Sequence, residues 1–423
     1  MHIGLIAPES HSHAAVATNV GRALAARGHR VSYVGFEDVR AVPEAAGLEF
    51  LAIAPDEYPD GSVDRMMREI SEARGLRSSL RTMKALGELL DCRLRRLPAL
   101  LRDAGIEALV ADQISPAAAT VCELLHIPHA TICAAVHMNY DEGVPPFFTP
   151  WQPRADRLGT LRNLAGYSFF DLVRRPMRRR LNRFRADHHL APYRDPHAGM
   201  SRRVQISQLH PAIDFAYTRL PDTFHYAGPL GDMTADQPGA FDETKLDGRP
   251  LVYCSFGTVN NKYRHLYATV LRAMANVDAQ LLLSTGGGDL DLGNAAPPDA
   301  IIATRVPQRR VLQHCAAFIS HCGVNSALEA VYAGVPIVGI PIANDQPGMA
   351  ARLAYHGAGV ALSSRNLRWR DLTSAVRTAL VDPQLRATSV RLQAEIRNSP
   401  GAAGAARLIE AAIARTSVVN IPD

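Results

Sequence analysis

The sequence has 423 residues, and at roughly 100–200 residues per domain this length predicts two or three domains, each large enough to bury its own core. Its hydrophobic fraction of 47% and charged fraction of 21% are those of an ordinary globular protein and exclude a disordered or fibrous chain. No apolar run is long enough to span a membrane, and the first residues lack a basic region and contain Pro8, so they do not form a typical signal peptide. We therefore expect a soluble, cytoplasmic protein.

Charge is distributed unevenly along the chain. The formal net charge is +5, yet seven arginines fall within residues 174–185 without an acid among them, so the rest of the chain carries about −2. A basic surface is therefore expected at one place only. The six cysteines are scattered and form no CxxC pair, which predicts reduced, mostly buried thiols and not a disulfide framework.

The first half of the chain alternates between short apolar runs and segments of helical periodicity. A strand is predicted at 3–7, followed by a loop at 8–13 and a helix that ends at Gly28. Further strands are predicted at 30–34 and 108–111, the latter followed by another helix. Strands that alternate with helices indicate a parallel, doubly wound sheet.

The same pattern restarts after a polar stretch at 231–248. Apolar runs at 251–256, 280–284, 318–320 and 337–340 are each followed by a loop and a helix. The predicted fold class is therefore α/β, with two doubly wound parallel-sheet (Rossmann-like) domains that face each other across a cleft. The predicted divisions are a first domain at 1–230, a linker at 231–248, a second domain at 249–400 and a terminal helix at 401–423, which is a candidate to cross back to the first domain.

Residues 305–347 combine polar and small side chains at strand-to-helix turns. The strand at 318–320 runs into His321, Gly323 is free of side-chain bulk, and Asn325 and Ser326 open a helix whose free N–H groups favour an anion such as a diphosphate. Glu329, one turn into that helix, is suited to accept hydrogen bonds from a vicinal diol such as ribose. Neither GxGxxG after the first strand nor GK[ST] is present, which argues against a dehydrogenase or a P-loop protein.

These residues form an ordered signature. PQ, SHCG, NS, the glutamate, GVP and DQ follow one another over about forty residues, and the segment resembles the donor-binding signature of UDP-dependent glycosyltransferases of the GT-B fold. YCSFGT at 253–258 and GPL at 228–230 resemble further elements of that family. The resemblance implies UDP-glucose as a co-substrate and no resident cofactor.

The resemblance assigns each donor group to a set of residues. Asp345 and Gln346 would hold the sugar, Glu329 the ribose, and Val306 and Gln308 would lie near the uracil. Gln346 favours glucose, and Glu329 favours UDP over a deoxythymidine carrier. Arg305 and Val324 stand where plant members of the family carry tryptophans. The residues expected at the diphosphate are Ser255, Thr258, His321, Gly323, Asn325 and Ser326.

The beginning of the chain resembles the start of the family's acceptor-binding domain. IAPESHSH places the catalytic histidine at His13, with Asp112 as its partner. A neutral imidazole is suited to take a proton from an alcohol, and a carboxylate on its other nitrogen fixes the tautomer. The expected reaction is a single inverting displacement. His11 is a competing candidate for the base, and a role for Asp112 as a helix cap stays open.

Metal binding is not expected. His314 and Cys315, like His321 and Cys322, leave no convincing ligand set. The Asp-Leu-Asp run at 289–291 follows glycines in a predicted loop and is interpreted as solvated.

A narrower resemblance concerns the acceptor. QISQLHPAIDF (205–215), LPDTFHYAGPL (220–230), LAPYR (190–194), VADQISPA (110–117) and NDQPGMAARLAYHGAG (344–359) resemble segments of bacterial zeaxanthin glucosyltransferases, which glucosylate carotenoid hydroxyls. The expected acceptor is thus a hydrophobic small molecule. Glycosyltransferases of macrolides or other polyketides share much of this pattern, and a GT-B nucleotide-sugar epimerase or a protein that only binds the nucleotide are further alternatives.

A basic amphipathic segment spans residues 170–185. Basic amphipathic helices bind anionic membrane surfaces, so the segment predicts peripheral contact with the inner face of a membrane. Packing of its apolar stripe on the first domain is an equal alternative. No aromatic-interleaved basic motif accompanies it, and a nucleic-acid partner is not expected. The stripe consists of Phe170, Val173, Met177, Leu181 and Phe184.

Overall fold

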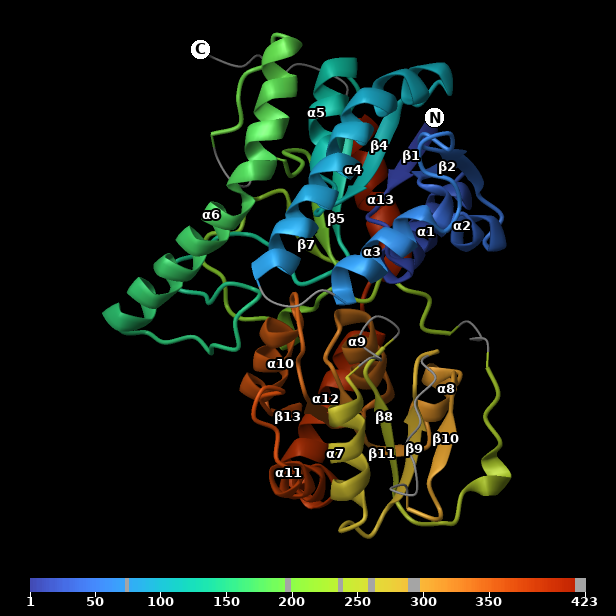
Figure 1. Ribbon diagram of the computed structural model, residues 1–423, viewed down its shortest axis with the longest axis vertical. Helices are drawn as coiled ribbons and strands as arrows, with labels where there is room; N and C mark the ends of the chain where they lie inside the picture. Colours follow the sequence, from blue (N-terminus) through green and yellow to red (C-terminus); the bar gives the residue numbers. More distant parts are fainter. Residues whose placement is uncertain (73–75, 195–198, 235–238, 258–262, 288–296, 415–423) are drawn as a thin grey trace.

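The computed structural model describes residues 1–72, 76–194, 199–234, 239–257, 263–287 and 297–414. The chain forms two sheets, one in the upper and one in the lower half of Figure 1, each covered by helices. The predicted pair of parallel-sheet α/β domains is therefore confirmed. None of the described helices combines the length and apolar character needed to cross a membrane.

The first sheet has seven parallel strands in the order β3-β2-β1-β4-β5-β6-β7. Its strands are β1 (His2–Ile6), β2 (Arg30–Gly35), β3 (Glu49–Ala52), β4 (Ala108–Asp112), β5 (His129–Cys133), β6 (Gln205–Ser207) and β7 (Phe224–Tyr226). Its helices are α1 (His11–Ala25), α2 (Ala41–Ala45), α3 (Ser62–Glu72), α4 (Leu76–Asp103), α5 (Pro116–Leu125) and α6 (Arg157–Asp187).

The second sheet has six parallel strands in the order β10-β9-β8-β11-β12-β13. Its strands are β8 (Leu251–Ser255), β9 (Gln280–Ser284), β10 (Ile301–Ala303), β11 (Cys315–Ser320), β12 (Ile337–Gly339) and β13 (Gly359–Ala361). The helices that follow are α7 (Arg264–Met274), α8 (Gln308–Leu312), α9 (Val324–Ala333), α10 (Gln346–Tyr355), α11 (Trp369–Val381), α12 (Pro383–Arg397) and α13 (Gly401–Ala414).

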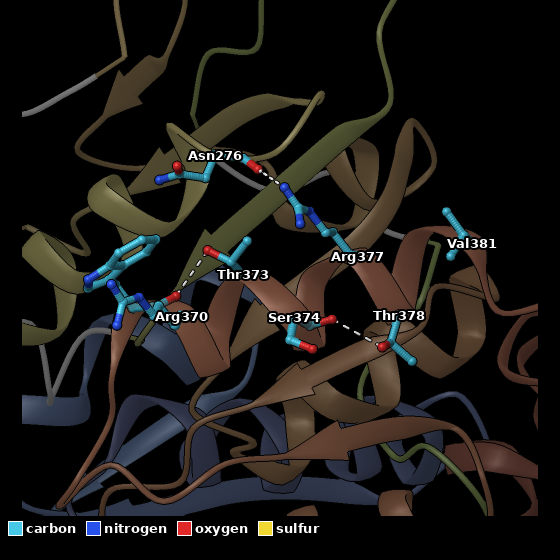
Figure 2. Close-up of a pocket in the computed structure, with 8 residues that line it drawn as sticks. Asn276, Arg370, Thr373, Ser374, Arg377, Thr378 and Val381 are labelled. Atoms are coloured by element: carbon cyan, nitrogen blue, oxygen red, sulfur yellow. Dashed lines mark hydrogen bonds between the residues drawn. The ribbon is translucent and has the colours of Figure 1, made fainter.

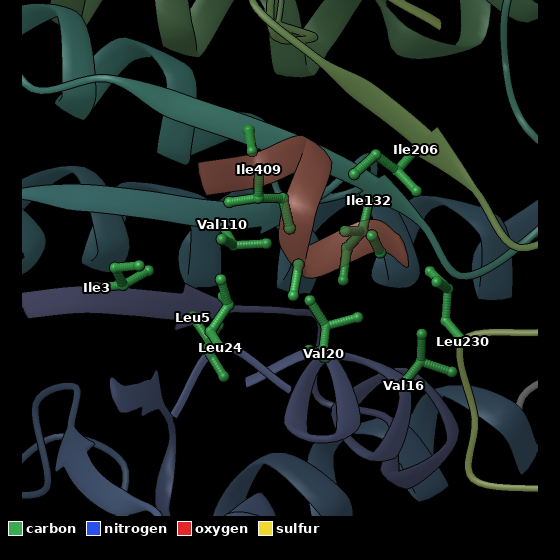
Figure 3. Packing of buried hydrophobic residues seen from close by; sticks show 14 of the residues in the cluster. Ile3, Leu5, Val16, Val20, Leu24, Val110, Ile132, Ile206, Leu230 and Ile409 are labelled. Atoms are coloured by element: carbon green, nitrogen blue, oxygen red, sulfur yellow. The ribbon is translucent and has the colours of Figure 1, made fainter. Parts of the chain in front are cut away.

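The terminal helix α13 lies against the first sheet and not the second. Figure 3 shows Ile409 of α13 among buried side chains of β1, β4, β5 and α1, including Val110 and Ile132. The Glu410 carboxylate also accepts hydrogen bonds from Arg27 (2.7 Å) and from the His29 imidazole (3.0 Å). The polypeptide thus returns to the first sheet at its end, and this packing ties the two halves of the molecule together.

Two predicted boundaries near the start of the chain are wrong. Helix α1 begins at His11, so the expected loop at 8–13 is shorter than predicted. The helix also ends at Ala25 and not at Gly28, where φ of +89° takes the chain into the left-handed region that glycine tolerates. His13 therefore lies in the first turn of a helix.

The amphipathic segment at 170–185 is helical, as part of α6, but most of its predicted apolar stripe faces inward. Leu181 is buried, and Met177 and Phe184 are half-buried, in a cluster with side chains of α4 and α5. Phe170 stacks on Phe148 with a centroid separation of 5.2 Å. The stripe is therefore used for packing on the first domain, the second of the two alternatives. All six cysteines are free thiols.

Candidate active site

The loops at the carboxyl ends of the two sheets contact one another. The Asn325 side-chain amide, in the first turn of α9, donates to the carbonyl of Ser12 in α1 (3.2 Å). The Asp345 carboxylate, in the loop after β12, accepts from the backbone N–H of Val136 in the loop after β5 (3.1 Å). Open α/β sheets bind ligands beyond the carboxyl ends of their strands, so this meeting place is the candidate active site.

On the first-domain side, His13 and Asp112 form a hydrogen-bonded pair. The imidazole Nδ1 lies 3.0 Å from the Asp112 Oδ2, and the Asp112 side chain is fully buried. The other carboxylate oxygen accepts from the backbone N–H of Ile114 (2.9 Å), which fixes the plane of the carboxylate. An N–H at Nδ1 that donates to this carboxylate leaves the Nε2 lone pair free as a base.

The environment of His13 favours its protonated form. Burial lowers the pKa of the imidazole, but the charges of Asp112 and Asp345 and the hydrogen bond to Asp112 outweigh it, so that the pKa lies above its ordinary value. His11, the competing candidate, is exposed in the same helical turn. The geometry therefore favours His13 as the base, and it gives Asp112 a partner besides the local backbone.

On the second-domain side, the N-terminus of α9 is open. Its N-cap residue Gly323 offers no side chain, so the N–H groups of the first turn have no side-chain cap. The ring of His321 lies directly beside it, since an ideal Cβ on Gly323 would be 2.7 Å from His321 Nε2 and one on Gly257 would be 3.0 Å from Cε1. A side chain at Gly323 would therefore displace the ring, and one at Gly257, where φ is +72°, would crowd it.

His321 is held neutral. Burial lowers its pKa to about 4, although a hydrogen bond with the backbone of Ser255 opposes the shift. Its Nδ1 is buried and has no hydrogen-bond partner within the described residues. A buried polar atom without a partner is costly unless a ligand satisfies it. A ring N–H of His321 beside a free helix N-terminus is suited to donate to a diphosphate oxygen.

The predicted nucleotide residues form a connected group on α8 and α9. The Gln308 amide nitrogen donates to the Glu329 carboxylate (2.6 Å) and to the Ser326 hydroxyl (3.2 Å), while Tyr253 donates to the Gln308 carbonyl (3.2 Å). Val306 is half-buried just before α8. The carboxylate at the expected ribose position is thereby oriented before any ligand binds.

Asp345 and Gln346 lie at the start of α10, but their side chains differ in use. Burial raises the pKa of Asp345, against the hydrogen bond from Val136 and the charge of His13. The Gln346 carbonyl oxygen accepts from the backbone N–H groups of Ile342 (2.9 Å) and Ala343 (3.0 Å), so it braces its own loop. Only its amide nitrogen remains to donate to a sugar hydroxyl.

The structure brings together the predicted residues His13, Asp112, Ser255, Val306, Gln308, His321, Gly323, Asn325, Ser326, Glu329, Asp345 and Gln346 at the facing ends of the two sheets. Thr258 and the Asp-Leu-Asp run at 289–291 lie outside the described residues. No group of three or more His, Cys, Asp or Glu side chains suited to a metal ion occurs in the described ranges.

Several supporting residues were not identified from the sequence. Gln208, after β6, donates to the Asn325 side chain (2.9 Å) and to the carbonyl of Ala134. Arg93 of α4 pairs with Glu9 and donates to the carbonyl of Ala7 (3.2 Å), which fixes the turn that leads to His13. Gln208 lies within a segment that carried the acceptor resemblance, and that was the only signal for it.

A hollow of the surface lies apart from the candidate active site. It lies along α11, at the far end of the second domain, where Thr373 and Arg377 bond to backbone carbonyls (Figure 2). Trp369 also packs against Arg272 of α7. Thr373 and Arg377 thus hold α11 to the end of α7.

Comparison with known proteins gives consistent matches. Residues 203–400 match the family described as UDP-glucoronosyl and UDP-glucosyl transferase. The chain is 30% identical over 425 residues to the zeaxanthin glucosyltransferase of Pseudescherichia vulneris, covering 99% of this chain and 100% of that protein. It is 28% identical over 416 residues to the zeaxanthin glucosyltransferase of Pantoea ananas (97% and 95% covered). It is also 30% identical over 320 residues to 4'-demethylrebeccamycin synthase of Lentzea aerocolonigenes (74% and 76% covered).

Solved structures share the fold. The glycosyltransferase of kitacinnamycin matches with a TM-score of 0.75 at 21% identity, covering 97% of this chain and 99% of that one. CalG4, the calicheamicin glycosyltransferase, matches with a TM-score of 0.75 at 21% identity and 99% coverage of both chains. The predicted GT-B fold is confirmed by this likeness.

Proposed function

The chain belongs to the family of UDP-glucoronosyl and UDP-glucosyl transferases, and within it we propose an inverting enzyme that moves glucose from UDP-glucose to a hydroxyl of a hydrophobic acceptor, zeaxanthin or a related carotenoid. That the protein is a glycosyltransferase that uses a nucleotide sugar follows from the family. The donor, the stereochemistry and the acceptor are the parts that we propose.

The observation that carries the proposal is the 3.0 Å contact between His13 and Asp112. In the proposed reaction, His13 Nε2 takes the proton of the acceptor hydroxyl while the hydroxyl oxygen attacks the anomeric carbon. The bond from that carbon to the diphosphate oxygen breaks on the opposite face, and UDP departs with the electron pair. Asp112 stabilises the imidazolium that forms, and the sugar passes through an oxocarbenium-like transition state with inversion at its anomeric carbon.

The proposed donor site lies opposite this pair. The diphosphate would take the free N-terminus of α9, where Asn325, Ser326 and the neutral His321 ring offer donors for the negative charge that grows on the leaving group. The ribose would bind Glu329, and the sugar would bind Asp345 and the amide nitrogen of Gln346. UDP-glucose is consumed in this reaction, so no resident cofactor is part of the proposal.

Two observations support a hydrophobic acceptor. Both zeaxanthin glucosyltransferases match over nearly their whole length. In addition, the segment between β5 and α6 carries Phe147 and Phe148, which pack with Phe170. The Phe147 carbonyl contacts α10 at Gly348, two residues after Gln346, which is proposed to bind the sugar. Apolar aromatic surface is therefore present next to the proposed transfer site. A membrane-borne acceptor would also give the protein a reason to contact a lipid surface.

The base assignment is tested by His13→Ala. Turnover should fall by about 10²–10⁴, the usual share of general-base catalysis, while UDP-glucose binding, measured by calorimetry, is retained. His11→Ala is the matched control, since His11 is an exposed histidine two residues away. Full activity of His13→Ala would contradict the assignment, and so would an equal loss in His11→Ala.

The acceptor and the donor are tested together by mass spectrometry of the products formed from UDP-glucose with zeaxanthin, a flavonol and a macrolide aglycone. Glucosylated zeaxanthin is the expected dominant product, with a β-linkage from the α-configured donor. Transfer only to the macrolide or flavonol would refute the carotenoid acceptor and favour the natural-product alternative, for which the match to 4'-demethylrebeccamycin synthase is the supporting observation. Turnover of UDP-glucose without any acceptor would favour an epimerase.

A further inference from the structure

The outer face of α6 carries a row of exposed apolar side chains. Leu158, Leu161, Phe169 and Leu172 are 60–67% exposed. With the exposed Ala165 between them they recur at steps of 3, 4, 4 and 3, which places them along one side of a helix. This row, hereafter the outer stripe, is distinct from the inward stripe that packs on α4 and α5.

Exposed apolar residues are concentrated on this helix. Of the twelve large apolar side chains that are exposed in the described ranges, five belong to α6, because Val173 (43% exposed) joins the four leucine and phenylalanine residues. Figure 1 shows the first half of α6 standing out from the flank of the molecule, away from both sheets. Single exposed apolar residues need no explanation, but a contiguous row of them marks an interaction surface.

Arginines continue the same face toward the C-terminal end of the helix. Arg175, Arg179 and Arg183 are exposed, and within the described part of the chain no ion pair is recorded for any of them. The other four arginines of this half are engaged elsewhere. Arg174 lies over the Phe170 ring, and ion pairs join Arg178 to Asp171, Arg180 to Asp91 and Arg185 to Glu123. The outward face therefore joins an apolar row to three cations that have no acid among the described residues.

The helix is held in place without help from a partner. The Asn163 amide donates to the carbonyl of Glu142 (3.0 Å), and the Tyr167 hydroxyl donates to that of Val144 (3.2 Å). Gly166 allows the helix backbone to approach Pro146, since an ideal Cβ on Gly166 would lie 2.9 Å from the Pro146 Cγ. These contacts fix the inner face of the protruding half, so the outer stripe is presented on a preformed helix and binding costs little ordering entropy.

The segment between β5 and α6 connects α6 to the candidate active site. It begins after β5, where the Val136 N–H binds the Asp345 carboxylate, and it reaches α6 through the cluster of Phe147, Phe148 and Phe170. A lipid surface in contact with α6 would therefore lie next to the segment that carries the aromatic cluster.

We propose that the outer face of α6 docks the protein on an anionic phospholipid bilayer, with Leu158, Leu161, Phe169 and Leu172 inserted at the boundary of headgroups and acyl chains and Arg175, Arg179 and Arg183 on the phosphates. Burial of the apolar row supplies affinity, and the arginines select for negatively charged lipid. The inference rests on the proposed function only in one respect: docking would serve to reach a membrane-borne acceptor. Its test measures lipid binding and not transfer.

The test is flotation of the full chain with vesicles of phosphatidylcholine and phosphatidylglycerol, compared with vesicles of phosphatidylcholine alone. The wild type should float with the anionic vesicles and much less with the neutral ones, and added salt should weaken the binding. Phe169→Ser/Leu172→Ser should lower the partition coefficient at least tenfold. Arg175→Gln/Arg179→Gln/Arg183→Gln should abolish the preference for anionic lipid. Val381→Ser/Val390→Ser, which removes two exposed valines from α11 and α12, is the matched control and should bind as the wild type does.

Three results would overturn the proposal. The first is no flotation of the wild type with anionic vesicles, and the second is a loss of vesicle binding in the Val381→Ser/Val390→Ser control equal to that in the α6 variants. The third is a dimer in sedimentation analysis that the Phe169→Ser/Leu172→Ser variant dissociates, since the outer stripe would then bind a second copy. Calorimetric binding of UDP-glucose and transfer to a water-soluble acceptor should be unchanged in both α6 variants. If the wild type binds anionic vesicles but transfers glucose to no acceptor, the proposed function is refuted and the docking surface is still supported.

Discussion

Arg352→Met should destabilise the protein strongly, because it would leave a carboxylate buried without its cation. Arg352 of α10 and Asp214 of the first domain are both fully buried, with Nε 2.7 Å from Oδ1. The other oxygen of Asp214 accepts from His137 (2.8 Å) and Tyr226 (2.9 Å), and Arg352 also donates to the carbonyl of Gly348 (3.1 Å). Methionine keeps most of the side-chain volume, so the lost charge is the main change.

The expected cost is about 3–5 kcal/mol, the range for breaking one partner out of a buried ion pair. Its pH dependence has a definite sign. Burial alone would raise the pKa of Asp214, but Arg352 and His137 outweigh it and hold the pKa far below its ordinary value, so in the wild type this stabilisation is present above the unfolded pKa of about 3.9 and is lost only as the pH falls through the folded value. Loss of Arg352 removes the largest of the contributions that lower the pKa of Asp214, so in the variant the pKa should lie higher than in the wild type. The difference in the free energy of unfolding between wild type and variant should therefore be largest at neutral pH and decrease on acidification.

Urea unfolding, followed by both circular dichroism and tryptophan fluorescence so that coincident transitions can be checked, measures this loss. Arg368→Met is the matched control, because Arg368 and Asp371 form an exposed pair whose loss should change the free energy of unfolding by no more than about 1 kcal/mol. Asp214→Asn should be costly alone, but combined with Arg352→Met it should cost several kcal/mol less than the sum of the two, since no unpaired charge remains. Additivity within about 0.5 kcal/mol would refute the reasoning.

Three further predictions concern the site. Because Asp112 and Asp345 raise the pKa of His13 against the effect of burial, the acid limb of the pH profile of kcat/KM should have an apparent pKa above 6.5, and Asp112→Asn should move this limb to lower pH; an unmoved limb would contradict the pairing. Glu329→Ala should weaken UDP binding by about ten- to a hundredfold in calorimetry, in line with a lost charged hydrogen bond, and should weaken 2′-deoxy-UDP binding less; equal losses would place the carboxylate elsewhere. Gly348→Ala should lower the thermal midpoint by an amount equivalent to about 1–3 kcal/mol, because an ideal Cβ would lie 1.8 Å from the Phe147 carbonyl oxygen, whereas Gly199→Ala, with nothing within 4 Å, should not.

The fold could be predicted from the sequence where strands are continuous apolar runs. The runs that became β1, β4, β8 and β11 are buried on both faces, and such strands stand out in the sequence as uninterrupted hydrophobic segments. The last two strands of the first sheet, β6 and the edge strand β7, have three residues each and mixed polarity, so periodicity could not detect them. Pairing makes them strands, since β6 pairs with β5 and β7 pairs with β6.

The candidate site was predictable where residues follow strand ends, because the doubly wound topology itself brings those ends together. Contacts between the domains were not. The bond from Val136 to Asp345 and the use of the Gln346 carbonyl within its own loop depend on how two distant segments meet. The two apolar stripes of α6 show the same limit: periodicity marks both faces as apolar, but only packing against α4 and α5 decides that Leu181 faces inward and Leu172 outward.

The links between the domains are made by the same loops that carry the candidate catalytic and donor groups. Asn325 binds Ser12 beside His13, Asp345 binds Val136, and the ion pair of Arg352 with the first domain anchors the helix that begins at Gln346. Because each of these bonds exists only when the two sheets are in this arrangement, closing the domains and assembling the site are one event. The base and the donor groups come from opposite domains, so neither domain alone holds a complete set. Loosening the contact should therefore lower turnover more than it lowers the binding of UDP, because all the proposed donor groups lie in the second domain.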